Sequence, residues 1–161
     1  MVIGYKCFKK GLISQYGDVF EVDKEYHDDG DIKFQYNGFH MCANLEDTLR
    51  YFDAFNEDID IASVIGYGVI NKYDDEYNEF FDMYAVEYLK ICCVLSREEI
   101  INYALSLPVM RLKSFLTLFK HTKDELKLFQ EKFYNENIIM ETIKYYQDEN
   151  SKVYVKKKKI V

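Results

Sequence analysis

The feature that most constrains this chain is a change in the spacing of its apolar residues near Ser96. Before it, segments such as residues 2–8 and 84–95 alternate apolar and polar side chains, which is typical of half-buried strands. After it, apolar residues recur every three or four positions, and Pro108 interrupts the pattern. The change predicts an α+β fold, with a mostly antiparallel sheet first and about four short helices after it.

We therefore expect two domains: an acidic α+β sheet domain at residues 1–95 and a helical region with a basic tail at residues 96–161. Within the first, residues 32–36 alternate as a strand would, and residues 44–55 predict the one main helix. A β-branched run at residues 61–70 contains two glycines, which indicates a bulged strand. In the second, Ser96 and Thr122 each precede a Glu by three positions, a spacing that predicts capping boxes.

Charge divides along the same boundary. Residues 1–95 carry 19 acidic and 8 basic side chains, whereas residues 96–161 carry 9 and 13. The acidic front disfavours a nucleic acid as its partner, because phosphates would be repelled. Four consecutive lysines at residues 156–159 account for much of the basic excess, and we interpret them as a solvated tail.

Neither a signal peptide nor a membrane span is evident. The N-terminus lacks an apolar run of the length that a signal peptide needs, and no stretch of about 20 apolar residues occurs. We expect a cytoplasmic protein with no membrane contact and with free, mostly buried thiols.

The stretch at residues 37–43 holds the residue that is hardest to explain, His40. A turn signal, Asn37-Gly38, leads into a short apolar segment in which His40 and Cys42 face one side. Three interpretations stay open. The one we favour is a hydrogen-bonded histidine with core cysteines; the others are a zinc site and a Cys–His nucleophile pair.

For metals, the expectation is that none is bound. His40 and Cys42 are the only closely spaced pair of soft ligands, although Cys7 and Cys92 or Cys93 would be needed beside them. Two acidic clusters, at residues 28–31 and 74–76, could hold a hard cation, but the first lacks the spacing and distal Glu of a calcium loop, and we interpret both as solvated loops.

Four segments come in an order that resembles an uncharacterised family of small phage and bacterial proteins with a G-F-H-x-C box. The likeness covers about residues 3–100. The segments are Gly4-Tyr5-Lys6-Cys7-Phe8, VFEVDKEY at residues 19–26, Gly38-Phe39-His40-Met41-Cys42 and LSREE at residues 95–99. The resemblance implies no activity, because that family has none established.

A more distant likeness is to ADP-ribosyltransferase-like folds, in which an aromatic-glycine box precedes a helix with a Tyr and a late strand offers a Glu. The resemblance casts His40, Tyr51 and Glu87 in these places, and the first strand offers Lys6 where such folds have His or Arg. It implies NAD as the cofactor of an active or degenerate enzyme.

The sequence thus favours a non-enzymatic protein-interaction module, of phage-accessory or immunity-like type, over an enzyme. Its acidic, Tyr-rich sheet would bind an unidentified protein partner of basic character. The alternative is the NAD-dependent enzyme, with His40, Tyr51, Glu87 and Lys6 as its candidate site residues and no bound cofactor expected otherwise.

Overall fold

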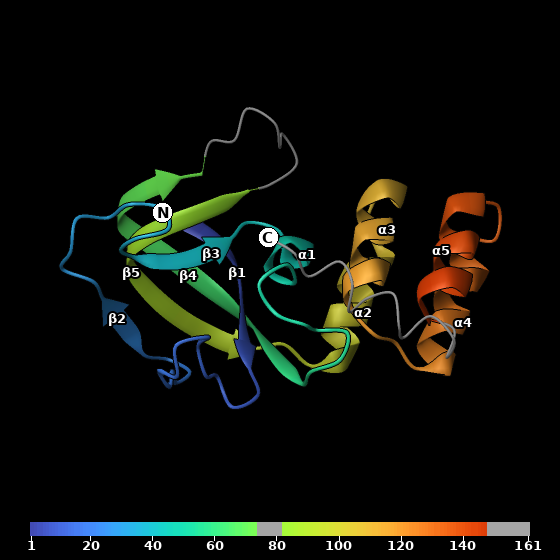
Figure 1. Ribbon diagram of the computed structural model, residues 1–161, viewed down its shortest axis with the longest axis horizontal. Helices are drawn as coiled ribbons and strands as arrows, with labels where there is room; N and C mark the ends of the chain where they lie inside the picture. The colour runs from blue at the N-terminus through green and yellow to red at the C-terminus, as the bar shows by residue number, and fades with distance from the viewer. Residues whose placement is uncertain (74–81, 148–161) are drawn as a thin grey trace. The chain divides into compact units, whose positions relative to one another are not determined.

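The computed structural model describes residues 1–73 and 82–147 (Figure 1). It divides into two compact units, which we call the strand unit (residues 1–53 and 57–95) and the helical unit (residues 54–56 and from 96 on). The elements in chain order are β1 (Val2–Lys9), β2 (Glu25–His27), β3 (Phe39–Cys42), α1 (Leu45–Thr48), β4 (Ile59–Lys72), β5 (Met83–Val94), α2 (Arg97–Leu105), α3 (Val109–Leu118), α4 (Lys123–Lys132) and α5 (Asn137–Gln147).

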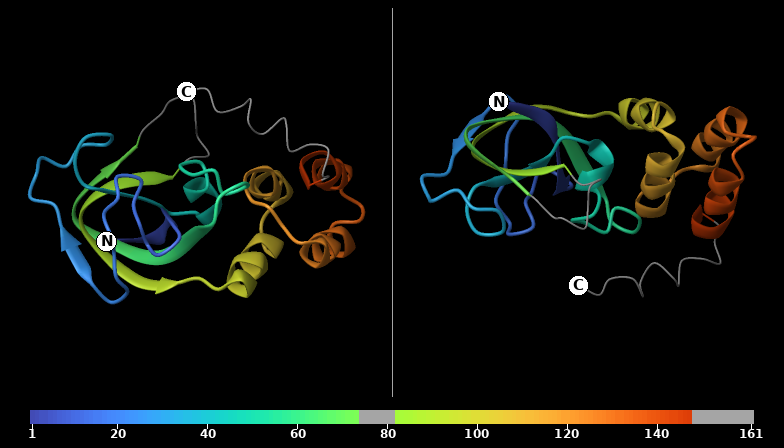
Figure 2. Two further views of the ribbon diagram at one scale, coloured as in Figure 1. Left: turned by 60° about the horizontal axis from the view of Figure 1, so that its bottom comes forward. Right: turned by 90° about the horizontal axis from the view of Figure 1, so that it is seen from above.

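The predicted α+β class with antiparallel strands first is confirmed. All strand pairings among the described residues are antiparallel, in the order β2-β5-β3-β1-β4. Because β5 also pairs with β4, the strands β5, β3, β1 and β4 form a ring. β2 pairs with β5 as well, further along that strand than β3 does. Figure 2 shows these strands curling round a small barrel.

Buried apolar side chains fill the inside of this barrel. Four of its aromatic rings are in mutual contact, with ring centroids 4.6–6.4 Å apart. The rings are those of Phe8, Phe20, Tyr26 and Phe39. The buried cluster is completed by Leu12, Met41, Ala62, Val64, Val86, Leu89 and Ile91.

One seam of the barrel is nearly unpaired. β1 and β3 share a single pair, Tyr5↔Cys42, whereas β1 and β4 pair along eight positions. At this pair the strands approach closely: a Cβ on Gly4 would overlap the backbone carbonyl of Cys42. Beyond it, β3 leaves β1, so the seam opens along the side chains that follow Tyr5.

The bulge expected in residues 61–70 is confirmed. The pairing of β4 with β5 shifts register between Tyr67 and Ile70, and Gly68 lies between them at φ 78°. Glycine adopts this left-handed conformation without the penalty that other residues meet.

The one main helix expected at residues 44–55 is not confirmed, because α1 covers only Leu45–Thr48. After it, the amides of Arg50 and Tyr51 donate to carbonyls three residues back, at 3.4 Å each, instead of four. Asn44 does not cap the helix through its side chain but donates to the carboxylate of Asp47. The apolar residues of this segment therefore pack from successive turns and not from one helix.

The prediction of a strand at residues 32–36 is wrong. This segment is a turn closed by the Lys33–Asn37 bridge, and Gln35 in it has φ 72°. A residue with positive φ turns the chain, so this segment is not extended. The alternation of apolar and polar residues that suggested a strand therefore belongs to a folded loop. This loop contributes directly to the site described below.

In the helical unit both predicted capping boxes are confirmed. The Ser96 and Thr122 side chains accept from the amides of Glu99 and Glu125, and each Glu returns a bond to the cap. Glu125 also binds the guanidinium of Arg97 through both carboxylate oxygens, at 2.8 Å each, which holds the pKa of Glu125 near 2 against burial. The start of α2 is thereby tied to the start of α4.

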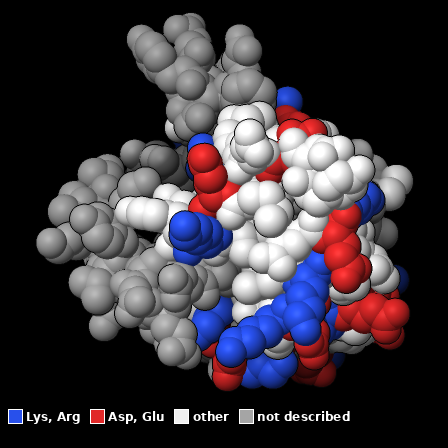
Figure 3. Space-filling model, turned by 90° about the vertical axis from the view of Figure 1, so that its right-hand side faces the viewer, with Lys and Arg blue, Asp and Glu red and all other residues white. Residues whose placement is uncertain are grey.

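The described surface of the helical unit mixes both signs of charge. Figure 3 views the side of α4 and α5, where acidic and basic side chains are interspersed. Residues 74–76 and the lysines at 156–159 lie outside the described residues. No helix in the described part of the chain combines the length and the apolar character needed to cross a membrane.

The contact at Gly4 yields the first prediction. Gly4→Ala should lower the free energy of unfolding by at least about 2 kcal/mol, because the new methyl group meets backbone and not a movable side chain. Urea denaturation followed by circular dichroism measures this loss. Lys9→Ala, exposed at the end of the same strand, is the control and should change stability by no more than about 0.5 kcal/mol. A Gly4→Ala variant as stable as this control would contradict the close approach of β1 and β3.

Candidate functional site

A pocket of about 580 Å³ opens in the strand unit where β1 and β3 separate. Residues from both faces of these strands line it, among them Lys6 and Cys7 of β1 and His40 and Met41 of β3. Neighbouring residues of a strand point to opposite faces, so the pocket reaches both faces because the seam is open. Its volume is in the range of sites that enclose a small organic molecule.

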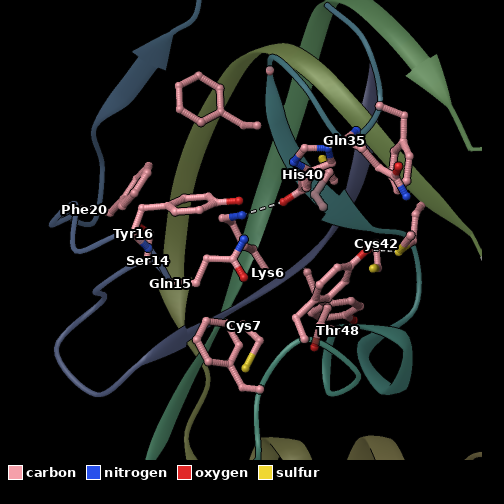
Figure 4. A pocket seen from close by; sticks show the side chains of 18 of the residues that line it. Lys6, Cys7, Ser14, Gln15, Tyr16, Phe20, Gln35, His40, Cys42 and Thr48 are labelled. Carbon is pink, nitrogen blue, oxygen red and sulfur yellow. Dashed lines mark hydrogen bonds between the residues drawn. The ribbon is translucent and has the colours of Figure 1, made fainter. Parts of the chain in front are cut away.

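Lys6 is the central polar residue of the pocket. Its ammonium donates a hydrogen bond of 2.7 Å to the backbone carbonyl of His40, across the open seam (Figure 4). The same nitrogen lies 5.6 Å from the centre of the Phe8 ring. Among the described residues, no carboxylate lies within ion-pair distance of this amine.

Burial controls the charge of Lys6. The Lys6 side chain is half-buried in the pocket, and this desolvation lowers the pKa of Lys6 to about 8. Negative thiolates beside Lys6 would oppose this shift. The neighbouring thiols stay protonated, however, because burial raises the pKa of Cys7 to about 12 and that of Cys42 further. Lys6 is therefore mostly an ammonium at pH 7, with roughly a tenth of it neutral.

His40 is held as a neutral imidazole. Its Nε2 accepts a hydrogen bond of 3.0 Å from the amide of Gln35, so the ring proton resides on Nδ1. Burial, followed by the charge of Lys6, lowers the pKa of His40. The ring of Phe34 meets it edge-on at 5.0 Å. The loop before β3 thus fixes the orientation of His40, and its Nε2 is engaged in that loop.

The loop itself is organised by Asp28. This carboxylate accepts from the amides of Gly30 and Gly38, at 2.8 Å each, and the two bonds lower the pKa of Asp28. Asp28 is one of two acidic residues among the described residues of the lining; the other, Asp18, accepts from Ser14 at 3.3 Å. Both carboxylates are therefore engaged with their own loops.

Aromatic and thioether groups make up much of the remaining wall. They are Tyr5, Tyr16, Phe20, Phe34, Phe39, Met41, Tyr51, Phe52, Tyr73 and Met83. The hydroxyl of Tyr51 donates to the sulfur of Met83, and burial raises the pKa of Tyr51. Flat apolar surfaces of this kind suit a planar or apolar ligand body.

Glu87, the fourth predicted site residue, is not in the pocket. Its carboxylate accepts from the amide of Val69 at 2.8 Å, inside the β4 bulge, and lies 3.4 Å from His27 Nε2. A Cβ at Gly68 would lie only 2.5 Å from Oε2 of this carboxylate, so the residue there has to be small. Glu87 therefore stabilises the bulge on the outside of the barrel.

The structure thus brings together three of the four predicted residues, namely Lys6, His40 and Tyr51, and leaves Glu87 apart. Sequence reasoning missed Gln35 and Asp28, which set His40 and its loop in place. The Asp28-x-Gly30 pattern was a usable signal, since an Asx turn needs an acid two residues before the amide it holds.

Two kinds of chemistry considered for the pocket, attack by a thiol and metal binding, find little support in the described residues. Cys7 and Cys42 stay protonated because burial raises their pKa values, so neither is a ready nucleophile beside His40. Within the described ranges, no three side chains of His, Cys, Asp or Glu converge on a point where a metal ion would be held.

Comparison with known proteins gives one match. The model of a family described as a domain of unknown function, DUF7666, matches residues 2–102, which include the whole pocket lining. No curated protein and no solved structure matches the chain.

The lowered pKa of Lys6 makes a prediction about stability. Between about pH 8 and pH 10.5 the unfolded chain keeps a proton on Lys6 that the folded chain has lost, so stability rises with pH relative to a variant without the amine. The free energy of unfolding of wild type minus that of Lys6→Met should increase by about 2–3 kcal/mol over this window. Urea denaturation at a series of pH values measures the difference.

Taking this difference removes the titrations that both proteins share. Among the residues that the structure describes, the other ionisable groups in the lining are Tyr5, Cys7, Tyr16, Asp18, Asp28, His40, Cys42, Tyr51 and Tyr73. A difference that stays flat or falls above pH 8 would contradict the desolvated amine.

Proposed function

The chain belongs to the DUF7666 family of domains of unknown function, and we propose that its strand unit is a binding module whose pocket takes up a small organic carboxylate. The observation that carries this proposal is the ammonium of Lys6, half-buried in the pocket without an acidic partner among the described residues. A buried cation is costly unless an anion or several hydrogen bonds compensate it. A carboxylate supplied by a ligand meets that need.

The rest of the lining favours a ligand with one charge and an apolar body. Asp18 and Asp28 are satisfied by loop donors, and His40 is neutral, so Lys6 is the dominant positive group. The aromatic wall described above lowers the polarity of the space around the amine. In such surroundings a charge-assisted hydrogen bond is worth about 1.5–3 kcal/mol.

A binding role fits this geometry better than catalysis. Nε2 of His40 is occupied by Gln35, both thiols are protonated, and Glu87 lies outside the pocket. An ADP-ribosyltransferase-like site needs a carboxylate beside the bound cofactor, and Glu87 does not supply it here. NAD binding and the enzyme alternative stay sequence-based predictions that this geometry does not favour.

The test compares an acid with its uncharged analogue. Indoleacetate and indoleacetamide have the same aromatic body, so their difference in affinity isolates the carboxylate. We expect the full chain to bind the acid at least about tenfold more tightly at pH 7, by calorimetry or by ligand-observed NMR. Above pH 8 the preference should fall about tenfold per pH unit, because the ammonium of Lys6 is lost.

Two variants make this result specific. Lys6→Met should bind acid and amide equally, while Lys10→Met, which removes an exposed lysine that pairs with Asp60, should keep the preference. Equal affinity for both probes in wild type, or a preference that survives Lys6→Met, would overturn the proposal. So would the absence of saturable binding by either probe at millimolar concentration.

A second candidate function is the protein interaction expected from the acidic, Tyr-rich sheet, and one observation favours it. Three rings stack across neighbouring strands: His27 on Tyr88 at 4.4 Å and 12°, and Tyr88 on Tyr67 at 5.0 Å and 5°. Carboxylates flank both ends, since Glu87 lies beside His27 and Glu25 accepts from the hydroxyl of Tyr67. Such a stack suits the guanidinium of an arginine in a basic partner.

Titration with an arginine-rich peptide tests this second candidate. Tyr88→Ala removes the middle ring and should weaken binding at least about fivefold at physiological salt. The matched control is Tyr36→Ala, which removes a tyrosine that is 81% exposed elsewhere in the strand unit. Equal losses in both variants, or none in either, would reduce the binding to general charge attraction and contradict a specific site.

A further inference from the structure

Lys6 has the surroundings of a reactive amine as well as those of an anion anchor. It projects from β1 into an aromatic-lined pocket, where it is half-buried and donates a hydrogen bond to the backbone carbonyl of His40. Most lysines of this chain whose side-chain partners are described are instead exposed and paired with acids, such as Lys10 with Asp60 and Lys72 with Asp82. An amine that is held in such a pocket, with no acidic partner in the part of the chain that the structure describes, is in position to attack a carbonyl carbon of a ligand.

We propose that Lys6 captures small aromatic aldehydes in this pocket as a reversible imine. The inference rests on the proposed function, because it uses the same pocket, but it adds a covalent step and a second ligand class. The domain would then retain a carbonyl ligand and not transform it, which is consistent with a binding module.

The step balances without any further reactant. The lone pair of the neutral Lys6 nitrogen forms a bond to the carbonyl carbon, and the carbon–oxygen π pair moves to oxygen. Two protons pass from nitrogen to this oxygen, which leaves as water when the carbon–nitrogen double bond forms. Amine and aldehyde thus give imine and one water, and hydrolysis reverses the step.

Burial also supplies the neutral amine that the step consumes. Because the pKa of Lys6 is lowered to about 8, about half of it is neutral at pH 8. An exposed lysine with an ordinary pKa is neutral to well under about 1% at that pH. The aromatic rings of Phe20 and Phe39 line the same space, where the ring of an aldehyde would pack.

Reductive trapping tests the proposal. The full chain is incubated with benzaldehyde at pH 8 and sodium cyanoborohydride, which reduces the imine to a stable benzyl amine. Peptide mass spectrometry then gives the rate of labelling at each lysine. We expect Lys6 to be labelled at least about tenfold faster than Lys120, an exposed lysine measured in the same digest. Labelling of Lys6 should saturate with benzaldehyde and be slowed by indoleacetate.

Three outcomes separate this inference from the proposed function. Selective, saturable labelling of Lys6 supports the imine, whether or not indoleacetate binds on its own. Labelling of Lys6 at the rate of Lys120, with tight binding of indoleacetate, overturns the imine and leaves the carboxylate site standing. Failure of both overturns both. Lys6→Arg keeps a cation but removes the nucleophile, so it should retain the preference for the acid and lose the fast label.

Discussion

A hydrogen bond from a side chain, and not from the backbone, spans the weakest seam of this barrel. β1 and β3 pair only at Tyr5 and Cys42, and the next available link between them is the ammonium of Lys6 on the carbonyl of His40. A strand edge left open inside a protein exposes polar groups that must be satisfied. Lys6 satisfies one of them, and the pocket lies where the two strands are apart.

The same seam explains why small residues occur where they do. Gly4 permits the single close pair, and Gly66 leaves room for Met41 and Val86 inside the barrel. At the outside, Gly68 and Glu87 form the bulge that redirects β4. Bulges bend a strand and increase its twist, which a ring of so few strands requires to close. Closure, the open seam and the bulge are therefore parts of one geometric solution.

Much of this fold was predictable from spacing, because burial on one face imposes a period that the sequence displays. The long strands β4 and β5 and the capping boxes at Ser96 and Thr122 follow from such local signals. Residues 32–36 and 44–55 did not follow, since their apolar side chains pack from turns whose shape depends on distant partners. Asp28 accepting the amide of Gly38, ten residues away, is such a partner.

For the site, the sequence indicated the residue types but not their grouping. Lys6, His40 and Tyr51 were singled out through a family resemblance, yet their shared pocket arises from β1 leaving β3, a long-range event with no local period. The property that makes Lys6 the centre of the site is equally non-local. A lysine side chain on a solvated strand has an ordinary pKa. The Lys6 amine is desolvated because residues from β1, β3 and two loops surround it. A site defined by desolvation becomes visible only when the surrounding chain is in place, and for that reason the binding role that we propose rests on the pocket more than on any single motif.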